Sequence, residues 1–260
     1  MKHIVMYSGG AGSWAAARRV AASHGTSDLL LVFTDTRMED PSLYRFLEAS
    51  SKEVGGTLIT LADGRTPWEV FWDTRFLGNT RVDPCSRILK RDLFKSWLQE
   101  RYTPEDCILY VGIDWQEEHR WERMRERWLP YVVEAPLCES PLISKARILR
   151  DVLEAGLEMP ALYQEGFPHN NCGGFCIKAG QAHFRLLLAT RPDQYAWHEA
   201  NEAALREHLG KDVAILRDRR GGKTRPLTMR EFRERSIPEG AVDEYEWGGC
   251  GCFSDEEAEG

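Results

Sequence analysis

The sequence predicts a doubly wound α/β fold with a mostly parallel five-stranded sheet, followed by a helical segment that bears cysteines. Short apolar runs alternate with helical patterns through the first half of the chain, which is typical of βαβ units with right-handed crossovers. Leu29–Phe33 is apolar at every position, as expected for a strand covered on both faces. A glycine-rich turn lies directly between the first expected strand and the first expected helix. These three observations favour a parallel sheet with helices on both faces.

Each expected strand is a short, mainly apolar run. The five strands are expected at His3–Tyr7, Leu29–Phe33, Thr57–Leu61, Cys107–Ile113 and Tyr131–Ala135. The helices between them are bounded by proline in the first turn or glycine after the last, which are common helix limits. They are expected at Ser13–His24, Pro41–Lys52 and Arg87–Glu100, with a further charged helix around His119.

The second half of the chain has a different character. Three more helices are expected, at Ser144–Ala155, Ala179–Leu188 and Asp193–Leu209, before a basic, turn-rich stretch and an acidic end. We therefore expect a nucleotide-binding α/β domain over residues 1–155 and a helical region with a candidate metal or cluster site over 156–253. Residues 254–260 are expected to be a disordered acidic tail.

Composition narrows the class of protein. The chain has 260 residues, of which 42% are hydrophobic, and 34 basic against 41 acidic residues give it a net charge of −7. Attraction of the whole molecule to nucleic acid is therefore not expected, although a local basic patch is compatible with this charge. No apolar run approaches the roughly 18 residues of a membrane span, and the N-terminus shows no signal-peptide pattern. Seven cysteines without a signal peptide indicate a reducing compartment. We expect a cytoplasmic protein with no membrane partner.

The sharpest local signal is the loop Ser8-Gly9-Gly10-Ala11-Gly12-Ser13. A glycine turn that opens a helix gathers backbone N–H groups at the helix N-terminus, where they bind phosphate or pyrophosphate. One alternative is that the loop is only a tight strand-to-helix turn and binds no ligand. A second alternative is a dinucleotide site for NAD(P), because Gly10-x-Gly12-x-x-Ala15 fits that fingerprint and Asp35 follows the second strand. The mononucleotide P-loop pattern GxxxxGK[ST] is absent.

Four segments in order resemble the N-type ATP pyrophosphatases and the related phosphoadenylyl-sulfate (PAPS) reductases, a Rossmann-like superfamily. The Ser-Gly-Gly-x-x-Ser loop is similar to their pyrophosphate-binding loop. The others are Phe33-Thr34-Asp35-Thr36 with Glu39, Pro84-Cys85-Ser86-Arg87-x-x-Leu89-Lys90, and Gly112-Ile113-Asp114-x-x-Glu117-x-His119-Arg120 followed by Pro136-Leu137. The resemblance covers about residues 1–145. Two departures stand out: Gly12 replaces an Asp common in the pyrophosphatases, and the reductases' catalytic Glu-Cys-Gly-Leu-His tail is absent.

The resemblance implies an enzyme that splits ATP between its α and β phosphates, with Mg²⁺ as cofactor. It implies that Ser8, Gly9, Gly10, Gly12 and Ser13 hold pyrophosphate. In the same reading Asp35 contacts the ribose or helps to hold metal, Lys90 neutralises phosphate, and Asp114 acts in catalysis. Gly112 and Arg120 complete the nucleotide site, although Arg120, with Arg123, fits the solvated face of a charged helix equally well. The implied function is activation of a nucleobase or nucleic acid for sulfur insertion or a related replacement. A PAPS-type reductase and a non-catalytic ATP-binding module are the alternatives.

The cysteines form a second group of candidates. Cys172 and Cys176 flank a Gly-Gly-Phe stretch, and Cys250 and Cys252 form another close pair. Two pairs of thiols can hold a tetrahedral Zn²⁺ or an iron–sulfur cluster. The resemblance adds Cys85 as a further ligand or catalytic thiol and favours a [4Fe–4S] cluster. The alternative is that these thiols are inert or redox-active. Cys107 and Cys138 are expected to be core or incidental residues.

Two further expectations concern partners. A basic turn carries Arg217, Arg219, Arg220, Lys223 and Arg225. It is compatible with a polyanion such as tRNA or DNA and equally with a solvated loop. His169, beside Asn170, Asn171 and Cys172, is compatible with a site residue, but a loop hydrogen bonder is the commoner role. The implied function is also compatible with a protein that donates sulfur, and a homodimer is compatible with the sequence.

Overall fold

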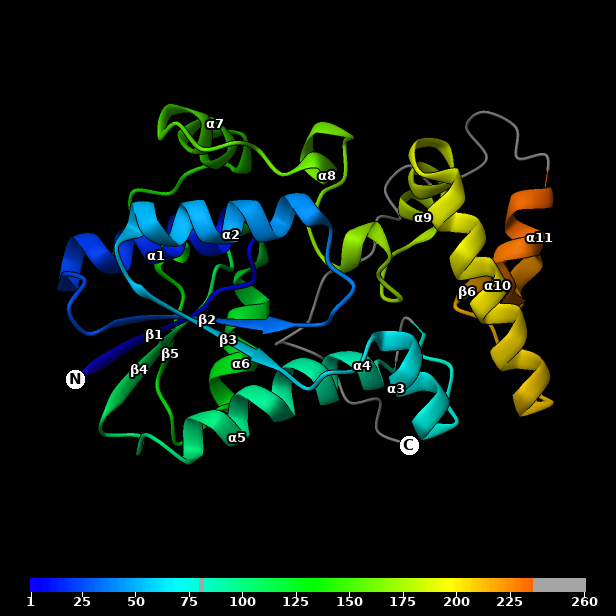
Figure 1. Cartoon of the computed structure of the whole chain (residues 1–260), viewed down its shortest axis with the longest axis horizontal. Coiled ribbons are helices and arrows are strands. Elements are labelled where there is room, and N and C mark those ends of the chain that lie inside the picture. Colours follow the sequence, from blue (N-terminus) through cyan, green and yellow to red (C-terminus); the bar gives the residue numbers. More distant parts are fainter. Residues whose placement is uncertain (80–81, 236–260) are drawn as a thin grey trace.

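The computed structural model describes residues 1–79 and 82–235. Its central sheet confirms the predicted fold: five strands, all parallel, in the order β3-β2-β1-β4-β5 (Figure 1). The strands are β1 (Lys2–Met6), β2 (Leu29–Asp35), β3 (Thr57–Ala62), β4 (Cys107–Tyr110) and β5 (Val133–Glu134). β1 is central and pairs with β2 on one side and with β4 on the other. The strand order reverses between β1 and β4, and ligands bind at the carboxyl ends of strands flanking such a reversal.

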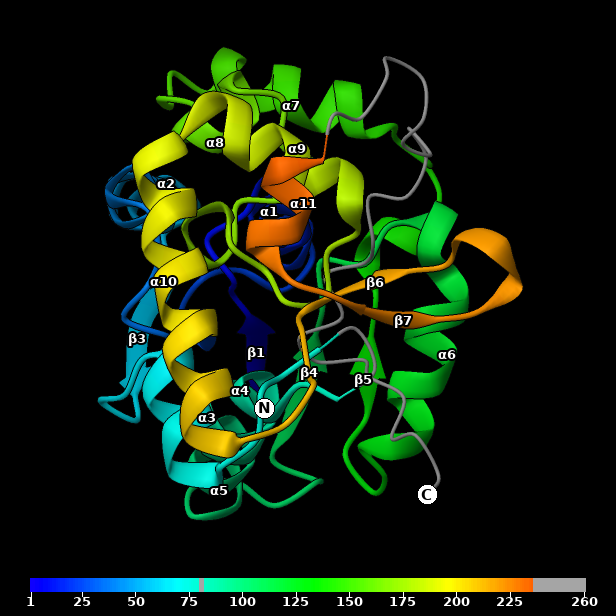
Figure 2. The same cartoon turned by 90° about the vertical axis from the view of Figure 1, so that its right-hand side faces the viewer.

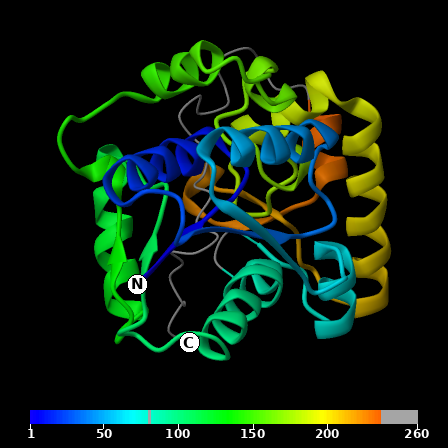
Figure 3. The ribbon, with the colours of Figure 1, turned by 60° about the vertical axis from the view of Figure 1, so that its left-hand side comes forward.

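Helices cover both faces of the sheet, as predicted (Figure 1). One face packs against α1 (Ala11–His24), α2 (Pro41–Val54) and α7 (Lys145–Glu154). The other packs against α5 (Leu93–Gln99) and α6 (Glu118–Arg127). Figure 3 shows the two layers from the side. Alternate strand residues serve the two cores: Val5 and Tyr7 face α1 and α2, whereas Ile4 and Met6 face α5 and α6.

Several elements differ from the sequence-based expectation. β4 ends at Tyr110 rather than Ile113, because the chain leaves the ladder before Gly112. The expected helix Arg87–Glu100 is α4 (Pro84–Ser86), a π-helical stretch (Arg87–Asp92) and α5 in succession. A helix that was not predicted, α3 (Pro67–Thr74), begins at a Thr66–Glu69 capping box.

A second hydrophobic core lies beside the sheet. It combines α3 and the start of the 84–99 helical stretch with later elements: α8 (Ala161–Gln164), α9 (Gln181–Thr190), α10 (Pro192–Leu209) and α11 (Met229–Glu234). At its centre Phe175 stacks on His198 with ring centroids 3.7 Å apart, and the Trp68 indole donates to His198 Nδ1 at 3.0 Å. Figure 2 looks onto the carboxyl side of the sheet and shows α10 and α11 in front of the strands.

The later elements also include a small antiparallel hairpin, β6 (Leu216–Asp218) and β7 (Arg225–Leu227). Five short 3₁₀ or π segments complete the described elements: Arg87–Asp92, Trp115–Glu117, Pro136–Cys138, Cys172–Gly174 and Arg220–Gly222. Across residues 1–79 and 82–235, no helix combines the length and the apolar composition that crossing a membrane requires.

Candidate functional site

A cavity of about 160 Å³ opens at the carboxyl ends of β1 and β4, where the strand order reverses. The glycine loop after β1 forms one wall and residues Gly112–Asp114 after β4 form another. The remaining walls include Lys90, Glu117, Arg120, Lys145, Tyr163, His169 and Asn170. The structure thus brings together, around one cavity, predicted residues from three of the four segments that carry the resemblance.

The glycine loop lies against the end of β4 with almost no space between the backbones. A Cβ atom on Gly12 would lie 2.9 Å from the carbonyl oxygen of Gly112, and one on Gly112 would lie 2.5 Å from the Ser13 nitrogen. Gly9 has a φ of +75°, a conformation that favours glycine, and a Cβ there would meet Leu43 at 2.9 Å. Glycine is therefore required at Gly12 and Gly112 by contact with backbone atoms and at Gly9 by its backbone conformation.

The first turn of α1 faces the cavity. Gly10 is the N-cap residue, and Ser13 lies inside the first turn, where its hydroxyl donates to the Gly10 carbonyl at 2.9 Å. The Ser8 hydroxyl donates to Ser13 Oγ at 3.3 Å, and the Ala11 N–H donates to the Tyr163 hydroxyl at 3.2 Å. Backbone N–H groups and two serine hydroxyls thus gather at the positive end of the helix dipole.

Charged side chains add to this arrangement. Three basic side chains, Lys90, Arg120 and Lys145, and two acidic ones, Asp114 and Glu117, line the described cavity. Arg120 pairs with Glu117 at 2.5 Å. Asp114 caps the short segment Trp115–Glu117 by accepting from the Gln116 N–H at 2.9 Å. The three cations, together with the helix N-terminus, favour an anionic ligand such as a phosphate chain.

His169 also lines the cavity, and its protonation is opposed by its surroundings. Its pKa is lowered to about 3, chiefly by burial and then by the neighbouring Lys145 and Arg120, so the imidazole is neutral at physiological pH. Asn170 beside it is buried, and its amide donates to the Gly9 carbonyl at 3.4 Å. From the sequence, a role in the site was the less common alternative for His169, and neither Lys145 nor Tyr163 was predicted to belong to the site. These residues precede the Cys172–Cys176 stretch, and no local pattern shows that this segment folds back onto the glycine loop.

Glu39 connects the cavity to the cysteine-bearing loop. Its buried carboxylate lies 3.7 Å from the Lys90 ammonium, accepts from the Thr36 hydroxyl at 2.9 Å, and accepts from the N–H of Cys172. Burial raises the pKa of Glu39, whereas Lys90 and the two hydrogen bonds lower it. Lys90 lines the cavity while balancing this buried charge. The sequence placed Glu39 in a motif without giving it a role.

Three of the predicted cysteines lie in two segments of the chain: Cys85 in α4, and Cys172 and Cys176 in the segment before α9. Cys85 is buried in α4 at the edge of the second core. Cys172 is also buried and has a φ of +51°, and both Gly173 and Gly174 after it have positive φ. Cys176 is partly buried and packs against the same core. In the part of the chain that the structure describes, no three His, Cys, Asp or Glu side chains are grouped so that they could hold a metal ion. Cys250 and Cys252, like the tail 254–260, lie outside the described residues.

The remaining candidates lie away from the cavity. Asp35, at the end of β2, is not among its lining residues and accepts hydrogen bonds at 2.8 Å from the Arg37 N–H and the Tyr44 hydroxyl. Cys107 is buried in β4, and the Cys138 thiol donates to the Ile113 carbonyl at 3.6 Å. Burial raises the pKa of both thiols to about 11. Such thiols are poor nucleophiles and poor metal ligands at neutral pH, as expected of packing residues.

Comparison with known proteins found similarity to a solved structure but none to a family model or a curated sequence. No family model matches the chain, and no curated protein matches its sequence. Among solved structures, the chain is similar to PAPS reductase from Candida auris in a phosphate complex, with a TM-score of 0.45 and 14% sequence identity. The alignment covers 64% of this chain and 79% of the reductase chain.

Proposed function

We propose that the cavity binds ATP and that the protein splits it between the α and β phosphates, activating an acceptor by adenylation. The observation that carries this proposal is the helix N-terminus of α1, which faces a cavity lined by three basic side chains. The cavity also lies at the strand-order reversal of a parallel sheet, where nucleotides bind in doubly wound folds.

In the proposed reaction, a nucleophilic atom of the acceptor attacks the α-phosphorus. The bond from that phosphorus to the bridging oxygen breaks, pyrophosphate leaves, and the acceptor loses a proton. Ser8, Gly9, Gly10, Gly12 and Ser13 hold the departing pyrophosphate through backbone N–H groups and hydroxyls. Lys90, Arg120 and Lys145 balance the charge that develops on its oxygens.

A magnesium ion fits the residues present. Mg²⁺ in nucleotide sites is held by phosphate oxygens and one or two carboxylates, and Asp114 supplies a carboxylate in the cavity. When bound, the ion would neutralise phosphate charge. Asp35, which lies outside the cavity lining, is a less suitable ligand, and we propose for it a contact with the outer part of the nucleotide.

We further propose that the adenylated acceptor, a nucleobase or another part of a nucleic acid, is then attacked by sulfur with release of AMP. Cys172 and Cys176 follow shortly after the cavity residues His169 and Asn170, and Glu39 links Cys172 to Lys90. This continuity supports a role for Cys172 and Cys176, with Cys85, in delivering sulfur or in holding a cluster. Because no three His, Cys, Asp or Glu side chains are grouped in the described part of the chain, a site of four thiolates would need both Cys250 and Cys252 beside two of these cysteines.

ATP-dependent thermal stabilisation tests the proposal. A ligand that binds only the folded state stabilises it by about 2.7 kcal/mol at a hundredfold excess over Kd. A Cβ on Gly10 would lie 3.1 Å from the Tyr163 hydroxyl and beside the phosphate path, so Gly10→Val should abolish this stabilisation. Ala22→Val, an exposed change near the far end of the same helix, should preserve it.

Pyrophosphate release then separates catalysis from binding alone. Release on adding a nucleic acid acceptor supports adenylation. An equal ATP response in wild type and in Gly10→Val would contradict the site. Sulfite release from PAPS would replace the proposal with a reductase, and stabilisation by NAD(P) but not by ATP would replace it with a dinucleotide enzyme.

A further inference from the structure

The hairpin β6–β7 is strongly basic within an acidic chain. Residues 216–228 contain five basic residues and one acidic residue, Asp218, which gives this short segment a charge of +4 (five minus one). The whole chain carries −7. The basic residues are Arg217, Arg219, Arg220, Lys223 and Arg225. Such a concentration of charge is not required to form a two-stranded hairpin.

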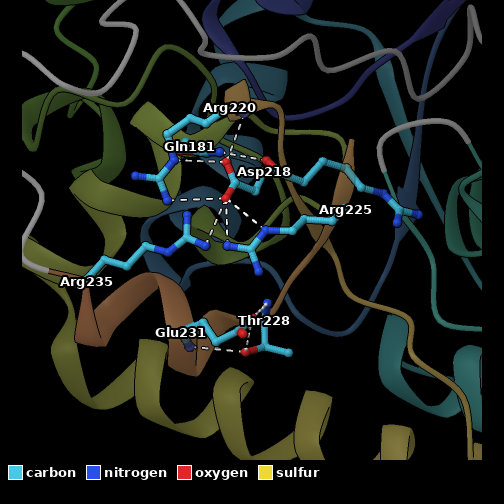
Figure 4. A network of polar contacts seen from close by, with 8 residues as sticks. Gln181, Asp218, Arg220, Arg225, Thr228, Glu231 and Arg235 are labelled. Atoms are coloured by element: carbon cyan, nitrogen blue, oxygen red, sulfur yellow. Dashed lines mark hydrogen bonds and ion pairs between the residues drawn. The ribbon is translucent and has the colours of Figure 1, made fainter. Parts of the chain in front are cut away.

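Asp218 organises the arginines (Figure 4). Its carboxylate is buried and accepts from Arg220, from Arg225 and from Arg235 at the end of α11, each at 3.0 Å. One negative charge thus balances one of three guanidinium groups. The hydrogen bonds from Arg220 hold the pKa of Asp218 well below its usual range, so the carboxylate stays ionised at neutral pH.

The arginines are fixed and yet face solvent. The side chains of Arg220 and Arg225 are 70% and 57% exposed, although both are bonded to the buried carboxylate. Each arginine donates hydrogen bonds to Asp218 from its Nε and one terminal nitrogen, and its other terminal nitrogen does not contact Asp218. Guanidinium groups fixed in this way lose less side-chain entropy when they bind, and their planar donors match phosphate oxygens.

The hairpin also lies on the side of the molecule where the cavity opens. Figure 2 looks onto the carboxyl side of the sheet and shows β6 and β7 in front of β4 and β5, with the tip at the edge of the molecule beside α6. Arg219, Arg220 and Lys223 belong to this tip and are exposed. A long polyanion that contacts the tip would therefore pass along the same side as the candidate site.

We propose that the hairpin is a docking surface for the phosphodiester backbone of double-stranded DNA. The strands of the hairpin are covered, because Leu216, Asp218 and Leu227 are buried, so the exposed tip is the part that enters a groove. The major groove of B-form DNA, about 12 Å wide, admits such a tip, whereas the deep and narrow major groove of A-form RNA does not. Arginines on the tip then reach the flanking phosphates. This inference deepens the proposed function by naming the nucleic acid acceptor as double-stranded DNA, and it rests on that function only for the reaction that follows docking.

The test measures binding of the full-length protein to a short labelled DNA duplex as a function of salt. Four phosphate contacts, one for each surplus charge, predict a slope of about −3.6 in log affinity against log salt. Raising salt from about 50 to 200 mM should then weaken binding about 150-fold. In Arg219→Gln/Lys223→Gln, which removes two exposed charges, the same change should weaken binding only about 12-fold.

A matched double variant, Lys95→Gln/Arg150→Gln, removes two exposed charges from α5 and α7 and should behave as the wild type does. An RNA duplex of the same sequence should bind more weakly than DNA. Equal slopes in both double variants, RNA binding as tight as DNA binding, or no DNA binding would each overturn the inference. The ATP-dependent stabilisation measured on the same samples keeps the two proposals distinguishable, because neither double variant alters a residue that lines the cavity.

Discussion

His169 shows how the cavity acts on a single side chain. An exposed histidine gains a proton near pH 6.5, but His169 is enclosed among groups that oppose its protonation. The unfolded chain therefore takes up a proton below pH 6.5 that the folded chain refuses until about pH 3. Stability is unaffected by this residue above pH 6.5 and falls as the pH drops below that value.

We predict that His169→Gln reduces the acid sensitivity of the fold. Between pH 7 and pH 5, His169 should lower the free energy of unfolding by about 2 kcal/mol, and the variant should lack this contribution. Urea unfolding at the two pH values measures the difference. His119→Gln, an exposed change on α6, serves as the control. An unchanged pH dependence in His169→Gln would show that the imidazole is not held neutral.

The sequence predicted candidate-site residues that adjoin one another in the chain and missed those that reach the cavity from later segments. Ser8–Ser13 could be found because a glycine turn between a strand and a helix has a direct physical meaning. Lys145 and Tyr163 could not, because their roles depend on how residues beyond α7 return to the sheet. Asp35 was predicted from its place at the end of β2, but its carboxylate is bonded to Arg37 and Tyr44 and is not among the residues that line the cavity.

At the scale of elements, the buried carboxylate of Asp218 joins β6, β7 and the end of α11. It accepts from three arginines and from the Arg220 N–H at 3.1 Å. Loss of its charge would leave three guanidinium groups close together without a counter-charge. The hairpin therefore depends on one acidic residue to a degree that its few ladder bonds do not suggest.

Asp218→Asn should accordingly destabilise the fold by about 2 kcal/mol, as expected for a buried carboxylate whose arginine partners are partly exposed. Asp212→Asn is the matched control, because Asp212 is 79% exposed and pairs with Arg206 at the surface. That change should cost no more than about 0.5 kcal/mol. Chemical denaturation of both variants at neutral pH provides the comparison. Equal stability of the two variants would be inconsistent with a role for Asp218 in organising the hairpin.

Elements with a strong period or a continuous apolar run were predicted close to their observed limits. β2 and α2 are examples, since the observed Leu29–Asp35 and Pro41–Val54 exceed the expected ranges by two residues each. The hairpin was missed because its strands have three residues each and one contains Pro226. The π-helical stretch Arg87–Asp92 was missed because its sequence also fits an ordinary α-helix.

At the scale of the whole molecule, the sheet and the second core meet around the candidate site. Cys85 and Cys176 pack on the second core, while Cys172 is bound to Glu39 beside the cavity. A metal or cluster held by these cysteines would join the two cores. Within the described residues no such group is formed, so a site of four thiolates would require both Cys250 and Cys252 beside two of the described cysteines.

Elemental analysis of anaerobically prepared protein tests this. We predict that the wild type contains iron and sulfide, or alternatively zinc, and that Cys172→Ser and Cys176→Ser both lose the metal because thiolates are the ligands. Cys138→Ser should retain it, since Cys138 bonds to the Ile113 carbonyl and packs against the core of the sheet, whereas Cys85 and Cys176 pack in the second core. A wild type that contains neither iron nor zinc would show that these cysteines have another role.

The contact between Gly12 and Gly112 has a consequence for how this sequence can change. The two positions lie a hundred residues apart in the chain, yet a Cβ atom on either glycine would overlap backbone atoms of the other loop. A substitution at one position cannot be accommodated unless α1 moves away from the end of β4. Because both contacts are with backbone atoms, a change at one glycine cannot compensate for a change at the other, and each glycine separately sets how close α1 can lie to the end of β4.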